Sequence, residues 1–345
     1  MSDYNLRISR SISDFETLAS TCSEGNIFQS REFFEIYREI GWRPLVLVAC
    51  DGDNPVAGFL AHTPLTKLSK VFPVLFLYRG PILIEDNVKS KKGLELLLRE
   101  LISYVKRNHF LSVDVKAPVT VGRNYDLFRK CRCEIVPNGE EYSIAIDLKR
   151  DLSAIWKSFR KDARKRIKKS LKHVEFKEVE TEAELEELYE VYLHTAMRRS
   201  FSPFPPDFFR SIKLRLRQRG FAQLLMAKYG GKTIAGAVDV IYGNTAETFI
   251  SCSYKQMWKF SPNHGLVWES ISRLKEDCTK FIIRCLPRQF DKTKEIDYFT
   301  FKTGFGGKIF RDYVHFSRAI NPLLGRFTKR AGWLTKISQL KSRRN

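Results

Sequence analysis

An internal repeat constrains the fold of this chain more than any other feature of its sequence. Three short segments of the first half return in the second half: Glu32-Phe33-Phe34 as Asp207-Phe208-Phe209, Gly41 as Gly220, and Val56-Ala57-Gly58 as Ile234-Ala235-Gly236. The pairs keep one order and are 175 to 179 residues apart in a chain of 345 residues. A constant order and spacing favour a duplicated domain over chance similarity between two segments.

The local patterns follow the same order in both copies. Helical periodicity in residues 14–41 precedes a hairpin pattern at 44–50 and 55–61, an apolar strand at 71–78, a helix at 91–108 and a strand at 111–115. The second copy repeats the last two as a helix at 265–278 and a strand at 281–286, and Phe301-Lys302 stands where the first copy has Phe128-Arg129. We therefore expect an α/β fold with two tandem domains, each with a mixed sheet, at residues 1–150 and 151–320, followed by a basic tail at 321–345.

The cysteines and histidines predict neither a metal site nor a disulfide framework. The seven cysteines are odd in number and none forms a CxxC pair, and the six histidines lack metal-ligand spacing. No uninterrupted apolar run approaches the ~18 residues of a membrane span. We expect a cytoplasmic monomer without a cofactor, whose only membrane contact would be peripheral, at the inner face.

The net charge of +21 is concentrated in two stretches. Residues 157–172 hold nine Lys/Arg against Asp162 alone, and residues 318–345 hold eight with no acid. Apolar residues from Trp156 to Leu171 have helical spacing, which predicts one helix with a cationic face. That face could bind phosphates of tRNA or of a substrate, or be only a solvated linker. Its candidate residues are Lys161, Arg164, Lys165, Lys168 and Lys169.

The tail has the pattern of a basic amphipathic helix on a membrane surface. A disordered end, or a helix packed on its own domain, fits the same pattern. If the tail binds a membrane, the acceptor could be lipid-linked.

The stretch Phe299-Thr-Phe-Lys302-Thr-Gly-Phe-Gly306-Gly307 stands out in the second copy. Aromatic residues and threonines favour a strand, and the glycines predict a turn that allows close approach of the backbone to another group. Locally, Lys302 could be a functional cation or a solvated lysine at a strand end.

Several motifs taken together resemble the FemAB family of tandem-GNAT aminoacyltransferases. They are Ile27-Phe28-Gln29-Ser30, Tyr78-Arg79-Gly80-Pro81-Ile82, Trp156 before a basic helix, Thr195-Ala-Met-Arg198 with Phe201, Ser261-Pro262-Asn263, and Phe301-Lys302 with its glycine bend. The resemblance covers residues 10–315 and depends on the order of the motifs. The chain departs from the family pattern at Ile283-Arg284-Cys285, and it lacks the coiled-coil insertion of some members.

The resemblance implies roles for particular residues. Lys302 would be the catalytic cation that stabilises the oxyanion of aminoacyl transfer, beside Phe301 in the substrate site, while Arg129 in the first copy would be structural. Arg198, and more weakly Arg38, would hold acceptor phosphates, and Tyr254 would bind a substrate amide or carbonyl. Ordinary explanations remain for Arg198, as a cation at a helix C-terminus, and for Tyr254, as a surface tyrosine.

The function expected on this basis is transfer of an amino acid from aminoacyl-tRNA to an amine of a nucleotide- or lipid-linked cell-wall precursor. We do not expect coenzyme A as the donor, because the chain lacks the Gln/Arg-x-x-Gly-x-Gly/Ala loop that binds its pyrophosphate. One alternative is an acyltransferase of the same fold that uses acyl-CoA or another activated acyl group in envelope polysaccharide synthesis. Another is a non-catalytic protein that binds nucleic acid or membranes.

Overall fold

The computed structural model describes residues 5–22, 25–65, 69, 71–286 and 293–320, and it divides into two compact units. The first unit comprises the described residues up to Glu141 together with those from Asp312 onward, and the second comprises Tyr142–Arg311. Both boundaries fall inside long strands, β7 (Glu134–Asp147) and β13 (Lys308–Ala319). Each of these strands therefore contributes to both units. The expected basic tail lies outside the described residues.

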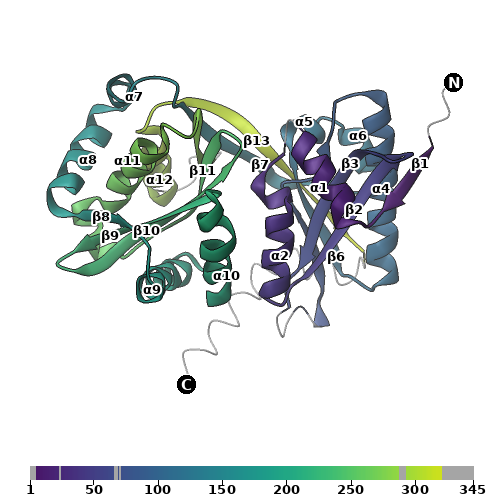
Figure 1. Cartoon of the computed structure of the whole chain (residues 1–345), viewed down its shortest axis with the longest axis horizontal. Coiled ribbons are helices and arrows are strands. Elements are labelled where there is room, and N and C mark those ends of the chain that lie inside the picture. Colours follow the sequence, from purple (N-terminus) through teal and green to yellow (C-terminus); the bar gives the residue numbers. More distant parts are fainter. Residues whose placement is uncertain (1–4, 23–24, 66–68, 70, 287–292, 321–345) are drawn as a thin grey trace. The chain divides into compact units, whose positions relative to one another are not determined.

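The first unit, which includes β1, β2, β3 and β6 in Figure 1, contains a mixed sheet in the order β1-β2-β3-β4-β6-β13. In this sheet β4 and β6 are parallel, and β5 pairs with β3. The predicted hairpin is confirmed as β2 and β3, which pair in antiparallel register. The strands besides β7 and β13 are β1 (Leu6–Ser9), β2 (Arg43–Asp51), β3 (Asn54–Thr63), β4 (Val74–Tyr78), β5 (Ile82–Leu83) and β6 (Ser112–Pro118). The α-helices are α1 (Ile12–Thr21), α2 (Arg31–Glu39), α4 (Val88–Arg107), α5 (Val119–Gly122) and α6 (Tyr125–Lys130).

Helix α4 supplies much of the apolar core of the first unit. Asn87 caps its N-terminus by accepting a hydrogen bond from the Ser90 backbone, and Lys106 and Arg107 lie in the last turn, where cations favour the helix dipole. The apolar residues that recur every three or four positions are all buried: Leu94, Leu97, Leu98, Leu101, Ile102 and Val105. The predicted helix and its inward face are confirmed.

The second unit contains a sheet in the order β7-β12-β11-β10-β9-β8, in which β11 and β12 pair in parallel and the other neighbouring strands of this order pair in antiparallel fashion. In Figure 1 this sheet lies between α8 and α11 on one side and α9 and α10 on the other. Its further strands are β8 (Glu175–Glu178), β9 (Ala222–Tyr229), β10 (Lys232–Tyr242), β11 (Thr245–Ser253) and β12 (Lys280–Leu286). Its α-helices are α7 (Leu152–Ser158), α8 (Lys161–His173), α9 (Glu182–Arg199), α10 (Pro206–Ser211), α11 (Pro262–Leu274) and α12 (Thr293–Thr303).

The repeat is confirmed in the contacts of equivalent glycines. A Cβ atom added to Gly58 on β3 would lie 2.7 Å from Leu18 of α1, and one added to Gly236 on β10 would lie 2.0 Å from Leu188 of α9. In both copies the added atom would also lie 3.1 Å from a carbonyl oxygen of the neighbouring strand. Each glycine therefore lets a helix of its copy, α1 in the first and α9 in the second, lie close against the sheet.

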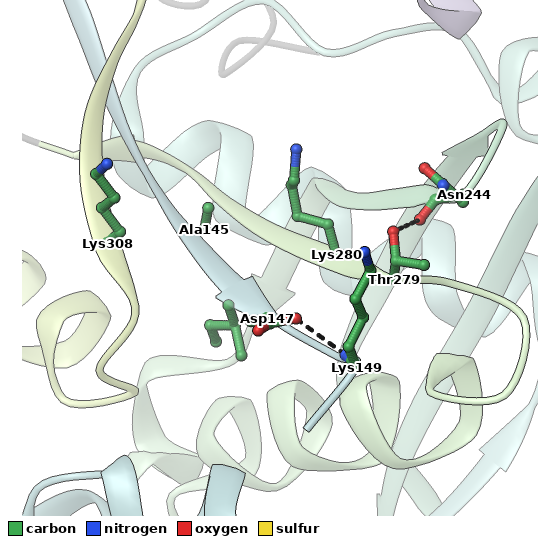
Figure 2. Close-up of a pocket in the computed structure, with 8 residues that line it drawn as sticks. Ala145, Asp147, Lys149, Asn244, Thr279, Lys280 and Lys308 are labelled. Carbon is green, nitrogen blue, oxygen red and sulfur yellow. Dashed lines mark hydrogen bonds between the residues drawn. The ribbon is translucent and has the colours of Figure 1, made fainter. Parts of the chain in front are cut away.

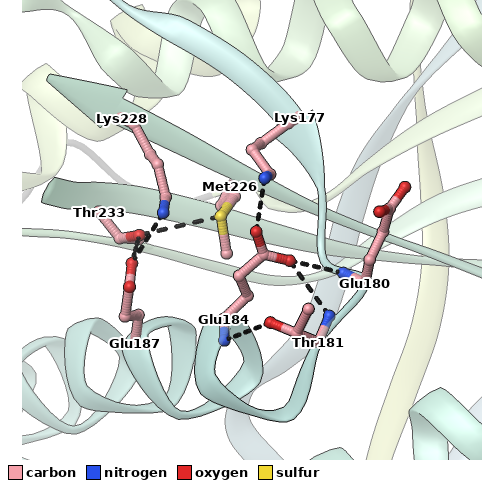
Figure 3. Close-up of polar contacts among 8 residues, drawn as sticks. All are labelled: Lys177, Glu180, Thr181, Glu184, Glu187, Met226, Lys228 and Thr233. Atoms are coloured by element: carbon pink, nitrogen blue, oxygen red, sulfur yellow. Dashed lines mark hydrogen bonds and ion pairs between the residues drawn. The ribbon is translucent and has the colours of Figure 1, made fainter. Parts of the chain in front are cut away.

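The start of α9 is fixed by a set of polar contacts (Figure 3). Thr181 and Glu184 form a reciprocal capping box, which satisfies backbone donors that a helix N-terminus leaves free. The Glu184 carboxylate also pairs with Lys177 of β8, and this hydrogen bond lowers the pKa of Glu184 to about 2. These contacts join α9 to the edge strand of the sheet.

The basic stretch does not form the single helix that its periodicity predicts. The chain breaks at Phe159 and Arg160, between α7 and α8, and Leu171 at the end of the expected apolar stripe is exposed. The helix is interrupted here because the Arg160 backbone N–H donates to the Gly304 carbonyl and not to a carbonyl of the preceding helical turn. Only Ala163, Ile167 and Ser170 of α8 are buried.

Candidate active site

The second unit has a point at which its two parallel strands stop pairing. β11 pairs with β12 only from Thr245 to Glu247, although β11 continues to Ser253. On its other side, β12 has an irregular register against β7 between Ile283 and Leu286, where Cys285 adopts a positive φ of 58°. Beyond Glu247 the two strands are therefore free to present backbone and side-chain groups to other elements.

Lys302 lies at this point, but on a helix and not on the strand that the sequence predicts. Residues Thr293–Thr303 form α12, and Lys302 is in its last turn. Its ammonium is buried and donates hydrogen bonds to the carbonyls of Arg284 and Cys285, the residues where β12 becomes irregular. The Nζ atom also lies 4.3 Å from the centroid of the Tyr298 ring. Lys302 thus connects α12 to the end of β12 through its charge.

A buried ion pair spans the two strands where their pairing ends. Glu247 is the last β11 residue that pairs with β12, opposite Ile282, and its carboxylate lies 3.7 Å from Nε of Arg284. Both side chains are less than a tenth exposed, at 9% and 5%. A buried carboxylate and guanidinium hold one another only in a well-defined geometry, because both lose their hydration. Arg284, where the chain departs from the family pattern, therefore has a structural role as the charge partner of Glu247 on β11.

An aromatic cluster packs beside Lys302. Phe301 contacts His264 edge-on at 4.7 Å between ring centroids, and Phe305 lies 5.3 Å from Phe301. Burial lowers the pKa of His264 to about 3, so its imidazole is neutral near pH 7. Phe301 therefore packs against the first turns of α11, next to the buried ammonium.

A second group of polar contacts surrounds the end of β11. Arg198, in the last turn of α9, donates to the Ser253 carbonyl at 2.7 Å and stacks over the Trp258 ring at 5.0 Å. Thr195 exchanges hydrogen bonds with the Ser253 backbone, and the Trp258 indole donates to the Ser253 hydroxyl. Burial lowers the pKa of Arg198, and the nearby charge of Arg199 adds to this effect. The guanidinium is thus already oriented by a carbonyl and a ring.

Tyr254 follows Ser253 and belongs to the same group. Its backbone N–H donates to Ile234, and its ring lies edge-on to His194 at 4.8 Å. Burial raises the pKa of the phenol, so Tyr254 is a neutral hydrogen-bonding group near pH 7. The structure therefore brings Arg198 and Tyr254 to one strand end.

Helix α8 carries the expected cations on its outer side. Lys161, Lys165, Lys168 and Lys169 are exposed and Arg164 is half-buried. Within the described part of the chain none of the five forms an ion pair, and the only acid of the helix, Asp162, pairs with Arg160. The buried side packs on α11. The helix thus presents uncompensated positive charge.

Arg38 does not join these groups. It lies on α2 of the first unit, where it is mostly exposed and pairs with Glu35 of the same helix. Among the described residues, no cluster of His, Cys, Asp or Glu could hold a metal ion, and no helix is long and apolar enough to cross a bilayer.

Glu247 and Trp258 are two residues of this region that the sequence patterns did not predict. An acid within the apolar strand Thr245–Ser253 is the signal that could have identified Glu247, since a buried carboxylate needs a charged partner. Trp258 lies among lysines in a short helical segment, and nothing local predicts its contact with Arg198.

Comparisons with known proteins agree with this architecture. Residues 157–281 match the family model described as an acetyltransferase (GNAT) domain. The solved structure of FemX is 13% identical with a TM-score of 0.71, covering 92% of this chain and 99% of FemX. A tandem GNAT protein from the clavulanic acid biosynthesis pathway is 9% identical, with a TM-score of 0.64 and coverage of 92% and 99%.

L-PGS from Bacillus licheniformis is 14% identical, with a TM-score of 0.56 and coverage of 91% of this chain and 94% of that one. A search of curated proteins found no match. The expected similarity to FemAB-like tandem GNAT proteins is confirmed for the fold. The chain therefore has a tandem GNAT fold, and its residues 157–281 match the model of an acetyltransferase (GNAT) domain.

Proposed function

We propose that this chain is an acyltransferase that moves an aminoacyl group from aminoacyl-tRNA to an amine of a cell-wall precursor. The observation that carries the proposal is the buried ammonium of Lys302 at the point where β11 and β12 stop pairing. Charge held away from water acts more strongly on a reacting group than charge in solvent. The likeness in fold to FemX supports the proposal.

The reaction needs little beyond position and charge. A neutral amine attacks the ester carbonyl, the carbonyl π electrons move to oxygen, and the tetrahedral oxyanion collapses to an amide as the ribose oxygen leaves with a proton from the amine. An ammonium has three N–H donors, and Lys302 directs two of them to the carbonyls of Arg284 and Cys285. The third donor would stabilise the oxyanion in this proposal, and the two carbonyls would hold the ammonium in place.

Two further groups fit the proposed substrates. The exposed cations of α8 suit the phosphates of tRNA, which a carrier-using enzyme would bind by charge and shape. Arg198 is oriented by Ser253 and Trp258, and we assign it to the phosphates of a nucleotide- or lipid-linked acceptor, with Tyr254 beside it as a hydrogen-bonding group. Arg38 is a weaker candidate for the same acceptor.

A transfer assay with charged tRNAs and muropeptide acceptors tests the proposal. Lys302→Met keeps the length of the side chain and removes its charge, so we expect a loss of about 10²-fold or more in kcat. Arg129→Met is the matched control, because Arg129 is in the last turn of α6, the helix equivalent to α12, and is exposed. Equal kcat values for the two variants, with both folded by circular dichroism, would contradict the role of Lys302.

A second candidate is acyl transfer from acyl-CoA, which the match of residues 157–281 to an acetyltransferase (GNAT) domain favours. Transfer of an acetyl group from acetyl-CoA, without transfer from any charged tRNA, would select this candidate. Absence of transfer from both donors, together with salt-dependent RNA binding that Lys302→Met leaves unchanged, would indicate a binding protein without catalysis.

A further inference from the structure

A pocket lies at the opposite ends of the strands from Lys302, and the proposed function does not use it. Its volume is about 460 Å³, and it is lined by Ala145, Ile146, Asp147, Lys149, Asn244, Thr279, Lys280 and Lys308 (Figure 2). β11 begins at Thr245 and β12 at Lys280, so this pocket is at the start of the two parallel strands, whereas the candidate active site is beyond the end of their pairing.

The frame of the pocket is fixed by backbone contacts. Lys280 is the register partner of Asp147 on β7 and of Thr245 on β11. The Thr279 N–H donates to the Asn244 carbonyl at 2.8 Å, and the Leu148 N–H donates to the Thr279 carbonyl at 2.9 Å. Three strand ends are thus tied together, so the residues on them keep their relative positions.

The glycine bend at Gly306-Gly307 brings Lys308, the third lysine of the pocket, to these strand ends. Gly307 has a positive φ of 84°, and a Cβ atom added to it would lie 2.6 Å from the Ala145 carbonyl oxygen. The next residue, Lys308, begins β13 and can line the pocket because the backbone passes β7 this closely. The bend therefore serves the contact of β13 with β7 in the second unit.

The charge in the pocket is mostly uncompensated. Lys149, Lys280 and Lys308 are exposed, and none forms an ion pair within the described ranges. The single acid, Asp147, accepts a hydrogen bond from the Lys149 backbone N–H at 3.0 Å. Three cations against one acid leave a net charge of about +2, which attracts multivalent anions.

We infer that this pocket binds a small oligophosphate, such as a di- or triphosphate. Lysine ammonium groups are compact charges on long stems and suit phosphate oxygens without requiring one fixed geometry. A pocket of this volume is within the range of small-molecule sites and is large enough for several phosphate groups. Three separate ammonium groups suit an anion with charge spread over more than one phosphate.

Isothermal titration calorimetry with inorganic triphosphate tests this inference on the full chain. We expect saturable binding, and a Kd at least tenfold higher in a triple variant that carries Lys149→Gln, Lys280→Gln and Lys308→Gln. A control triple variant, Lys106→Gln, Lys130→Gln and Lys232→Gln, removes the same charge from exposed lysines that do not line the pocket. Its Kd should stay within threefold of the wild-type value.

Two results would overturn the inference. One is binding that does not saturate in the wild type, and the other is an equal loss of affinity in both triple variants, which would mean general charge attraction. Lys302→Met should leave the Kd for triphosphate unchanged, because it removes no pocket residue. This readout separates the pocket from the proposed transfer reaction, so either can fail without the other.

Discussion

Replacing Asp239 by asparagine should change how the stability of the protein depends on pH. Asp239 lies on β10, is fully buried, and accepts a hydrogen bond from the Ser270 hydroxyl at 2.5 Å through Oδ2. Burial is the main cause that raises the pKa of this carboxyl from 3.8 to about 7, while hydrogen bonds from the side chains of Ser270 and Thr248 act in the opposite direction. The folded protein therefore favours the protonated acid.

The sign and size of the effect follow from proton binding. Below pH 4 both the folded and unfolded states hold the proton, and between pH 4 and 7 mainly the folded state does, so the unfolding free energy falls as pH rises through this window. The two pKa values, 3.8 and about 7, correspond to roughly 4 kcal/mol in total, since one pKa unit is worth about 1.4 kcal/mol. Asparagine has no such titration and retains an oxygen for Ser270.

The assay is urea unfolding of both proteins at pH values from 4.5 to 8.5. The unfolding free energy of Asp239→Asn minus that of the wild type should increase across this range by about 3 to 4 kcal/mol, even if the amide adds a constant cost of about 1–3 kcal/mol. Asp53→Asn, at a fully exposed carboxylate, gives the background. Parallel pH profiles for wild type and Asp239→Asn would refute the reasoning.

Two other substitutions test the packing and the ion pair. Gly236→Ala places a Cβ atom 2.0 Å from Leu188 and should lower the unfolding free energy by about 1–3 kcal/mol in urea titrations. Adding Leu188→Ala should restore part of this loss. Full stability of the single variant would contradict the close contact. Glu247→Gln removes the carboxylate that faces buried Arg284 and should lower the unfolding free energy by about 3 kcal/mol. Glu35→Gln, at the surface pair with Arg38, should lower it by less than about 1 kcal/mol in the same measurement. Equal losses in the two variants would argue against the buried pair.

The elements with long periodic patterns could be predicted from the sequence. The hairpin β2–β3 and the inward face of α4 depend on alternation and helical spacing within one segment, so local sequence was sufficient. The repeat of Gly58 as Gly236 could also be seen in the sequence. Both positions need glycine because a helix packs closely against the strand at that point.

The candidate site could be predicted only in part. Phe299–Lys302 has strand-favouring residues, yet it is helical because Phe301 packs against His264 of α11, a contact that local propensity does not contain. The pairing of Glu247 with Arg284 and the orientation of Arg198 by Trp258 join residues from different elements. Lys302 was identified from its motif, whereas its hydrogen bonds to β12 depend on the tertiary structure.

The division of β7 and β13 between the units bears on the order in which the protein can fold during synthesis. The sheet of the first unit is completed by residues Tyr313–Ala319 of β13, which pair with β6, and these residues are translated almost 200 positions after β6. While the ribosome makes the second copy, the edge of β6 that later receives β13 lacks this partner. An open strand edge is a site for incorrect pairing, so the nascent first unit depends on the later synthesis of β13 for protection.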